Sequence, residues 1–157
     1  EKDRLEAKTT FIANLKLAAP EAHKRDVVLL IEPINNKISI PGYFLNQVSE
    51  AREIIEEVRS DNVRLQFDLY HAQIMHGDLE ALIRDNIDIT RHFQIAGLSA
   101  RKEPNLGELN YPYLLNLIDS LNYTGWIGCE YHPNQSTISG LGWASEYGIK
   151  AWDVSDD

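Results

Sequence analysis

The sequence predicts an α/β protein with a parallel sheet. Segments with helical and strand-like patterns alternate along its 157 residues, and the strand-like segments are rich in aliphatic residues. Such alternation is typical of strands joined by right-handed helical crossovers. No linker rich in glycine, proline or serine divides the chain. We therefore expect a single domain over residues 1–157.

The first half of the chain contains two helical patterns and one strand-like run. Apolar residues recur at helical spacing within residues 1–24, which predicts one helix or two short ones. The run "VVLLIEPI" at 27–34 is typical of a strand that is buried on both faces. Residues 47–60 again show the helical period, with Ser49 as a candidate N-cap.

The second half repeats the same alternation. Strand-like segments occupy residues 63–71, 92–98 and 126–132, and helical segments occupy 78–86 and 111–122, with a last helix expected at 142–151. The chain therefore offers four strands, each preceded by a helix.

Composition restricts the partners. The formal charge is −9, with 24 acidic residues against 15 lysines and arginines. Nucleic acids and anionic membranes require a basic surface, so we expect neither partner. The single cysteine, Cys129, excludes an internal disulfide and a cysteine-rich zinc site. Without a signal peptide or a long apolar run, a cytoplasmic location is expected, and the start without Met, inside a helix, predicts a truncated or processed chain.

An oxygen-bearing side chain lies at or near the end of each predicted strand: Glu32, Asp68, Gln94 and Glu130. The carboxyl ends of parallel strands lie on one face of the sheet, so these side chains are expected to converge. Each one alone is more often a helix cap or a partner in an ion pair. Together, three carboxylates repel one another unless a cation is present, and this hard oxygen set favours Mg²⁺ or Mn²⁺.

Two further polar residues follow these strands. His71 lies three residues after Asp68, where it can contact a substrate oxygen or orient a ligand, or simply be a satisfied loop histidine. Arg101 offers a fork for a substrate carboxylate, or it is a solvated loop charge, which Lys102 and Glu103 beside it favour.

Longer stretches of the chain resemble the hydroxypyruvate isomerase family, which belongs to the xylose-isomerase-like TIM barrels. The resemblance runs from about residue 27 to 143 and rests on "LLIEPINN", "PGYFLN", "LQFDLYHAQIMHGDL", "FQIAGLSARKEPNLGELNYPYL" and "GWIGCEYHPNQSTISGLGW".

The resemblance implies an isomerase that interconverts hydroxypyruvate and 2-hydroxy-3-oxopropanoate (tartronate semialdehyde), with a small hydroxy-keto acid as substrate. It implies a divalent metal, Mg²⁺ or Mn²⁺, held by Glu32, Asp68, Gln94 and Glu130. Glu32 and Glu130 match the acid/base pair that transfers a proton through an enediolate, and His71 and Arg101 match positions that contact substrate. His132 stands where many members have arginine.

A complete TIM barrel needs eight strand–helix units and about 250 residues. The four strands visible here correspond to strands 5 to 8, the C-terminal half of such a barrel. An incomplete barrel leaves sheet edges exposed, so we expect self-association. Two alternatives stay open: a related sugar isomerase or 3-epimerase, and a catalytically inactive half-barrel.

Overall fold

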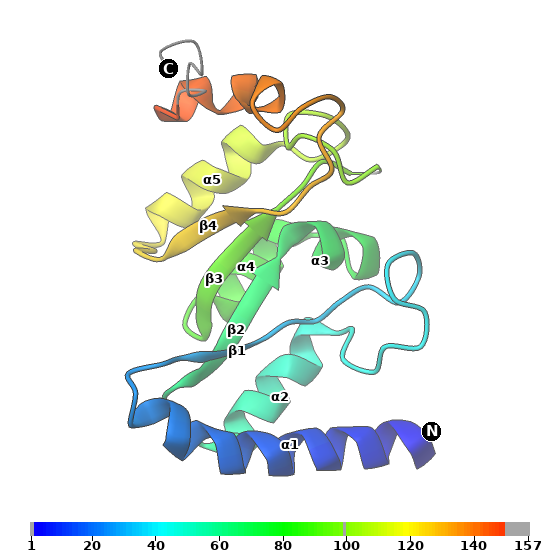
Figure 1. Ribbon diagram of the computed structural model, residues 1–157, viewed down its shortest axis with the longest axis vertical. Coiled ribbons are helices and arrows are strands. Elements are labelled where there is room, and N and C mark those ends of the chain that lie inside the picture. The colour runs from blue at the N-terminus through cyan, green and yellow to red at the C-terminus, as the bar shows by residue number, and fades with distance from the viewer. Residues whose placement is uncertain (1, 99, 150–157) are drawn as a thin grey trace.

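The computed structural model describes residues 2–98 and 100–149. In chain order the elements are α1 (Lys2–His23), β1 (Leu29–Ile31), α2 (Val48–Val58), β2 (Val63–Asp68), α3 (Leu69–Met75), α4 (Leu79–Asn86), β3 (Thr90–Ile95), α5 (Tyr111–Ser120), β4 (Trp126–Cys129) and the 3-10 helix η1 (Ser139–Tyr147) (Figure 1).

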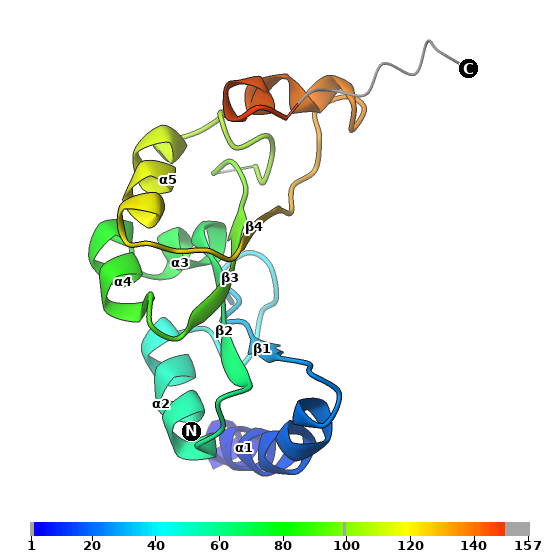
Figure 2. The ribbon, with the colours of Figure 1, turned by 90° about the vertical axis from the view of Figure 1, so that its left-hand side faces the viewer.

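The four strands form one parallel sheet in the order β1-β2-β3-β4. Sequence neighbours are therefore sheet neighbours, and helices α2, α4 and α5 lie on the same side of the sheet (Figure 2). This arrangement follows from crossovers of one hand, which return each strand beside the previous one. The α/β class with parallel strands is confirmed.

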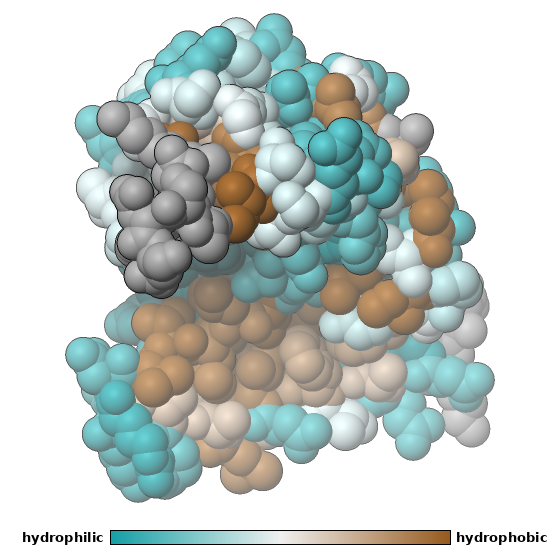
Figure 3. Space-filling view, turned by 45° about the horizontal axis from the view of Figure 1, so that its top comes forward, coloured by the Kyte–Doolittle hydropathy of each residue, from teal (hydrophilic) through white to brown (hydrophobic). Residues whose placement is uncertain are grey.

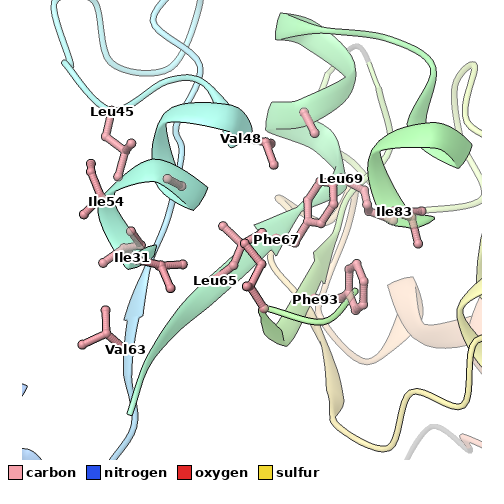
Figure 4. Close-up of a cluster of buried hydrophobic side chains, with 14 of the residues drawn as sticks. Ile31, Leu45, Val48, Ile54, Val63, Leu65, Phe67, Leu69, Ile83 and Phe93 are labelled. Carbon is pink, nitrogen blue, oxygen red and sulfur yellow. The ribbon is translucent and has the colours of Figure 1, made fainter. Parts of the chain in front are cut away.

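The core lies between the sheet and these helices. Side chains alternate across a strand, so Val63, Leu65 and Phe67 of β2 all face the helices, and all three are buried. Phe67 stacks on Phe93 of β3, with 5.5 Å between ring centroids. Ile54 of α2 lies in the same cluster (Figure 4). Burial of this one face holds the strands in register.

The expectation that residues 27–34 form a strand buried on both faces is wrong. The strand β1 covers only Leu29–Ile31, and the side chains of Val28 and Leu30 are 45% and 38% exposed. The physical reason is that the described helices cover one face of the sheet, while the opposite face is open (Figure 2). Trp126, in β4, is 82% exposed. Hydrophobic side chains accordingly gather over part of the molecular surface (Figure 3).

Several element boundaries differ from the sequence prediction. The strand expected at 63–71 ends at Asp68, where the short helix α3 begins. The Asp68 side chain accepts hydrogen bonds from the backbone N–H groups of Tyr70 and His71, so it caps that helix. Gln47, rather than Ser49, occupies the N-cap position of α2.

Differences also occur towards the two ends of the chain. Residues expected to form one or two helices make the single helix α1, which continues through Pro20. The third strand begins earlier than expected, at Thr90, and ends at Ile95. The last helix of the described residues is the 3-10 helix Ser139–Tyr147, and positions 150 and 151 of the expected helix lie outside those residues.

No helix in the described part of the chain has the length and apolar character needed to cross a membrane.

Candidate functional site

The centre of the candidate site is a pair of carboxylates. Glu32 directly follows β1, and Asp68 is the last residue of β2. Asp68 Oδ1 accepts from the backbone N–H groups of Tyr70 at 2.7 Å and His71 at 3.4 Å. Glu32 Oε2 accepts from Gln66 Nε2 at 2.8 Å. Each carboxylate is therefore anchored through one of its two oxygens.

The other two oxygens, Glu32 Oε1 and Asp68 Oδ2, are buried and have no hydrogen-bond partner among the described residues. A buried acceptor without a donor destabilises a fold by roughly 1–3 kcal/mol, and more when it is charged. Two such oxygens in adjacent positions are the arrangement that a bound cation relieves. The donor set thus fits a divalent cation that prefers carboxylate oxygens.

The pKa values of both carboxyl groups are raised, chiefly because the groups are buried. Burial raises the pKa of Glu32 to about 7, and the charges of Asp68 and Glu130 act in the same direction. Burial also raises the pKa of Asp68 to about 6, against the backbone hydrogen bonds and Arg101, which lower it. A cation bound between the two carboxylates would lower both pKa values towards their ordinary range.

His71 lies between the two carboxylates. Its Nε2 is 3.5 Å from Asp68 Oδ2 and 3.9 Å from Glu32 Oε1, and its side chain is 2% exposed. One ligand atom from each of these three residues lies within 4.8 Å of the others. Burial lowers the pKa of His71 to about 4, helped by the charge of Arg101, so the imidazole is neutral at pH 7. Of the two interpretations open from sequence, the geometry favours a residue of the site over an isolated loop histidine.

Gln94 and Glu130 join the site through amide hydrogen bonds. Gln94 is the register partner of Asp68 across β2 and β3. Its Nε2 donates to Glu130 Oε2 at 3.0 Å, and its Oε1 accepts from Gln66 Nε2 at 2.6 Å. Since Gln66 also donates to Glu32, two glutamine amides connect the two glutamates.

Sequence reasoning missed Gln66. The signal was present, because Gln66 lies two residues before Asp68 in the same strand and residues at that spacing share a face of the sheet.

Glu130 lies one residue beyond β4, and its side chain is 55% exposed. Its Oε2 accepts from Arg101 Nη2 at 2.8 Å, and its carbonyl oxygen accepts from Arg101 Nε at 3.2 Å. Arg101 Nη2 is also 3.5 Å from Asp68 Oδ2, and the guanidinium lies 5.1 Å from the ring centroid of Tyr70. Glu130 is thus outside the close group around His71 and is joined to it by Arg101.

Arg101 is not a solvated loop charge, since its side chain is only 20% exposed and is held against Glu130. The neighbouring Glu103 also departs from expectation, being 7% exposed. Its two carboxylate oxygens accept from the backbone N–H and the side-chain Nδ2 of Asn134, at 2.9 and 3.1 Å. Glu103 therefore holds the loop after β3 against the segment after β4, which are the two segments that carry Arg101 and Glu130.

Residues 1–147 match the xylose isomerase-like TIM barrel family, and the chain belongs to that family. The resemblance found in the sequence is confirmed at this level.

The relatives within this family are named as isomerases. The chain is 47% identical over 145 residues to a 2-oxo-tetronate isomerase of Cupriavidus necator, covering 92% of this chain and 55% of the relative. It is 42% identical over 138 residues to the hydroxypyruvate isomerase of Escherichia coli, covering 88% and 53%. A crystal structure from Brucella melitensis, described as an AP endonuclease of family 2, superposes with a TM-score of 0.88 at 44% identity, covering 92% of this chain and 55% of that one. The chain spans about half the length of the curated relatives it matches.

Proposed function

We propose that the chain carries the cation-binding and proton-transfer residues of an isomerase that interconverts hydroxypyruvate and 2-hydroxy-3-oxopropanoate. The observation that carries the proposal is a pair of buried oxygens, on Glu32 and Asp68, that accept no hydrogen bond from the described residues and lie beside a neutral His71. The names of the relatives support the reaction class. On this proposal the four strand–helix units are the C-terminal half, strands 5 to 8, of a TIM barrel.

The residues proposed to hold Mg²⁺ or Mn²⁺ are Glu32, Asp68, Gln94 and Glu130. Glu32 Oε1 and Asp68 Oδ2 offer the two oxygens that no donor in the described structure satisfies. Gln94 Oε1 and the Glu130 carboxylate would complete the oxygen set; in this structure they accept hydrogen bonds from Gln66 and Gln94, and Glu130 lies outside the close group around His71. When bound, the cation supplies electrostatic stabilisation for the negative charge that develops on the substrate oxygens.

The reaction moves one carbon-bound proton. A C–H bond breaks at the hydroxymethyl carbon and another forms at the neighbouring carbonyl carbon, while the hydroxyl proton passes to the former carbonyl oxygen, so no external oxidant or reductant is needed. We assign the carbon proton transfer to Glu32 and Glu130. Burial raises the pKa of Glu32 and a bound cation would lower it, so the balance of the two would set its strength as a base.

Arg101 and His71 are proposed to bind the substrate. Arg101 uses Nε and Nη2 to hold Glu130, while Nη1 makes no hydrogen bond to any described residue and can face the substrate carboxylate. An arginine fork suits a carboxylate, and an acidic chain that binds an anion requires such a local positive charge. His71 Nε2 faces the region between Glu32 and Asp68, where a substrate hydroxyl or carbonyl oxygen would lie.

A second candidate substrate is a four-carbon 2-oxo acid. The 47% identity to the 2-oxo-tetronate isomerase favours it, and the substrate retains the carboxylate that Arg101 would bind. A sugar isomerase or 3-epimerase would act on a substrate without that carboxylate, and an inactive half-barrel would bind the cation without turnover.

The test is an isomerisation assay on the 157-residue chain with hydroxypyruvate and with 2-oxo-tetronate, each in Mg²⁺, Mn²⁺ or EDTA. Product formation is followed by proton NMR. We expect metal-dependent turnover that is lost in Glu32→Gln and in Glu130→Gln. The exposed Glu146 provides the matched control, Glu146→Gln, which should retain turnover.

The outcomes separate the candidates. Turnover that persists in EDTA, or that neither glutamate substitution lowers, would contradict the proposal. Thermal stabilisation by Mg²⁺ without turnover of either acid would leave the inactive half-barrel as the better interpretation.

A further inference from the structure

The loop after β1 contains a buried amide, Asn35, three residues beyond Glu32 and fully inaccessible to solvent. Its Oδ1 accepts from the backbone N–H of Ile38 at 2.9 Å and of Ser39 at 3.1 Å. A backbone N–H can only donate, so two such contacts fix which end of the amide is the oxygen. The Nδ2 end must therefore face the other way.

The two hydrogens of Asn35 Nδ2 have two acceptors. One is Ser39 Oγ at 2.9 Å, and the other is His71 Nδ1 at 2.7 Å. An amide nitrogen donates and does not accept, so His71 Nδ1 must present its lone pair to Asn35. A hydrogen on Nδ1 would place two N–H groups against each other at this distance. The single hydrogen of the imidazole therefore resides on Nε2.

The hydrogen on Nε2 points into the carboxylate pair, because Nε2 lies 3.5 Å from Asp68 Oδ2 and 3.9 Å from Glu32 Oε1. A ring nitrogen that carries hydrogen has no lone pair for a metal ion. The proximity of Glu32, Asp68 and His71 thus does not make a three-ligand set, although their atoms lie close enough for one.

We propose that Asn35 is a positioning residue which locks His71 in the Nε2–H tautomer, so that His71 donates a hydrogen bond to a substrate oxygen and does not ligate the cation. The inference rests on the proposed function for the identity of that oxygen, and on the contacts of Asn35 alone for the tautomer. In this tautomer His71 would form a hydrogen bond to the substrate and would not be a ligand of the metal.

The tautomer is measured directly by long-range proton–nitrogen NMR of the ¹⁵N-labelled chain, with His71→Gln used to assign the ring signals. We expect the wild-type chain in EDTA to show hydrogen on Nε2 and a lone pair on Nδ1. Addition of Mg²⁺, which is diamagnetic, should leave that hydrogen in place. Hydrogen on Nδ1, or loss of the Nε2 hydrogen on adding Mg²⁺, would overturn the proposal without any variant.

Asn35→Asp tests the cause. An aspartate at this position still accepts from Ile38 and Ser39, but its second oxygen also accepts, so His71 Nδ1 should now carry a hydrogen. Asn36→Asp, at the half-buried neighbouring position, is the matched control and should leave the Nε2 hydrogen signal unchanged. A His71 Nδ1 that still lacks hydrogen in folded Asn35→Asp would refute the role of Asn35.

If Asn35→Asp does not fold, the spectra of the wild-type chain decide whether His71 carries its hydrogen on Nε2. Lack of isomerase turnover together with the Nε2–H signal would refute the proposed function and leave the tautomer assignment standing.

Discussion

The free energy of unfolding of the metal-free chain should depend on pH through Glu32, which is buried near other carboxylates. Burial and the neighbouring carboxylates raise the pKa of Glu32 from 4.5 to about 7 in the folded protein. The folded protein then binds this proton more tightly than the unfolded chain does. The contribution of Glu32 to stability therefore falls as the pH rises from 4.5 to 7, and its loss is complete above pH 7; Glu32→Gln isolates this contribution from that of His71, whose lowered pKa acts in the opposite direction.

The size of the effect follows from the same shift. Each pKa unit corresponds to 1.36 kcal/mol, so ionised Glu32 lowers the free energy of unfolding by about 3 kcal/mol at pH 8. The side chain is only 21% exposed, so solvent screening leaves most of this effect in place. Glu32→Gln cannot ionise and retains an oxygen that accepts from Gln66. We expect the variant to be about 3 kcal/mol more stable than wild type at pH 8 and nearly equal to it at pH 4.

The assay is urea unfolding followed by circular dichroism, in EDTA, at pH 4, 6 and 8, with Glu146→Gln as the control. Mg²⁺ should then stabilise the wild-type chain at pH 8 and stabilise Glu32→Gln much less, because a ligand that binds only the folded state raises its stability. A variant that is no more stable at pH 8, or that gains equally at every pH, would refute the reasoning.

The remaining predictions concern residues that contact the site or its loops, and the edges of the sheet. Gln66→Leu removes two amide hydrogen bonds and should raise the Mg²⁺ concentration for half-maximal thermal stabilisation about tenfold; an unchanged midpoint would contradict its role. Tyr111→Phe removes a buried hydroxyl that bridges both backbone groups of Ala96, and urea unfolding should show a loss of about 1–3 kcal/mol, whereas no loss would count against the bridge. Glu103→Ala should accelerate amide hydrogen exchange at Asn134 and not in α4, and equal exchange in both proteins would show that the contact does not hold the loop. Strands β1 and β4 lie at the two ends of the described sheet, so sedimentation velocity should detect association that increases with concentration, and a monomer at every concentration would contradict this.

The sequence predicted the core of the fold because the pattern that specifies it is local. The alternation of Val63, Leu65 and Phe67 marks the buried face of β2 without reference to any other segment. The helix α3 was missed for a related reason. Its first residues, Leu69 and Tyr70, continue a strand-like run, and only the cap supplied by Asp68 turns the chain into a helix there.

The candidate site, too, was predicted from the sequence only in part. The sequence by itself determined the order of the elements, the parallel sheet and the presence of Glu32, Asp68 and Gln94 at neighbouring strand ends, since periodicity and crossover handedness suffice for these. Only the tertiary structure decided how individual atoms are paired: which carboxylate oxygens accept no hydrogen bond from the described residues, and which groups Arg101 and Asn35 contact. Those pairings depend on strand register, loop path and side-chain rotamers, which bring together residues far apart in the chain and leave no periodic trace in the sequence.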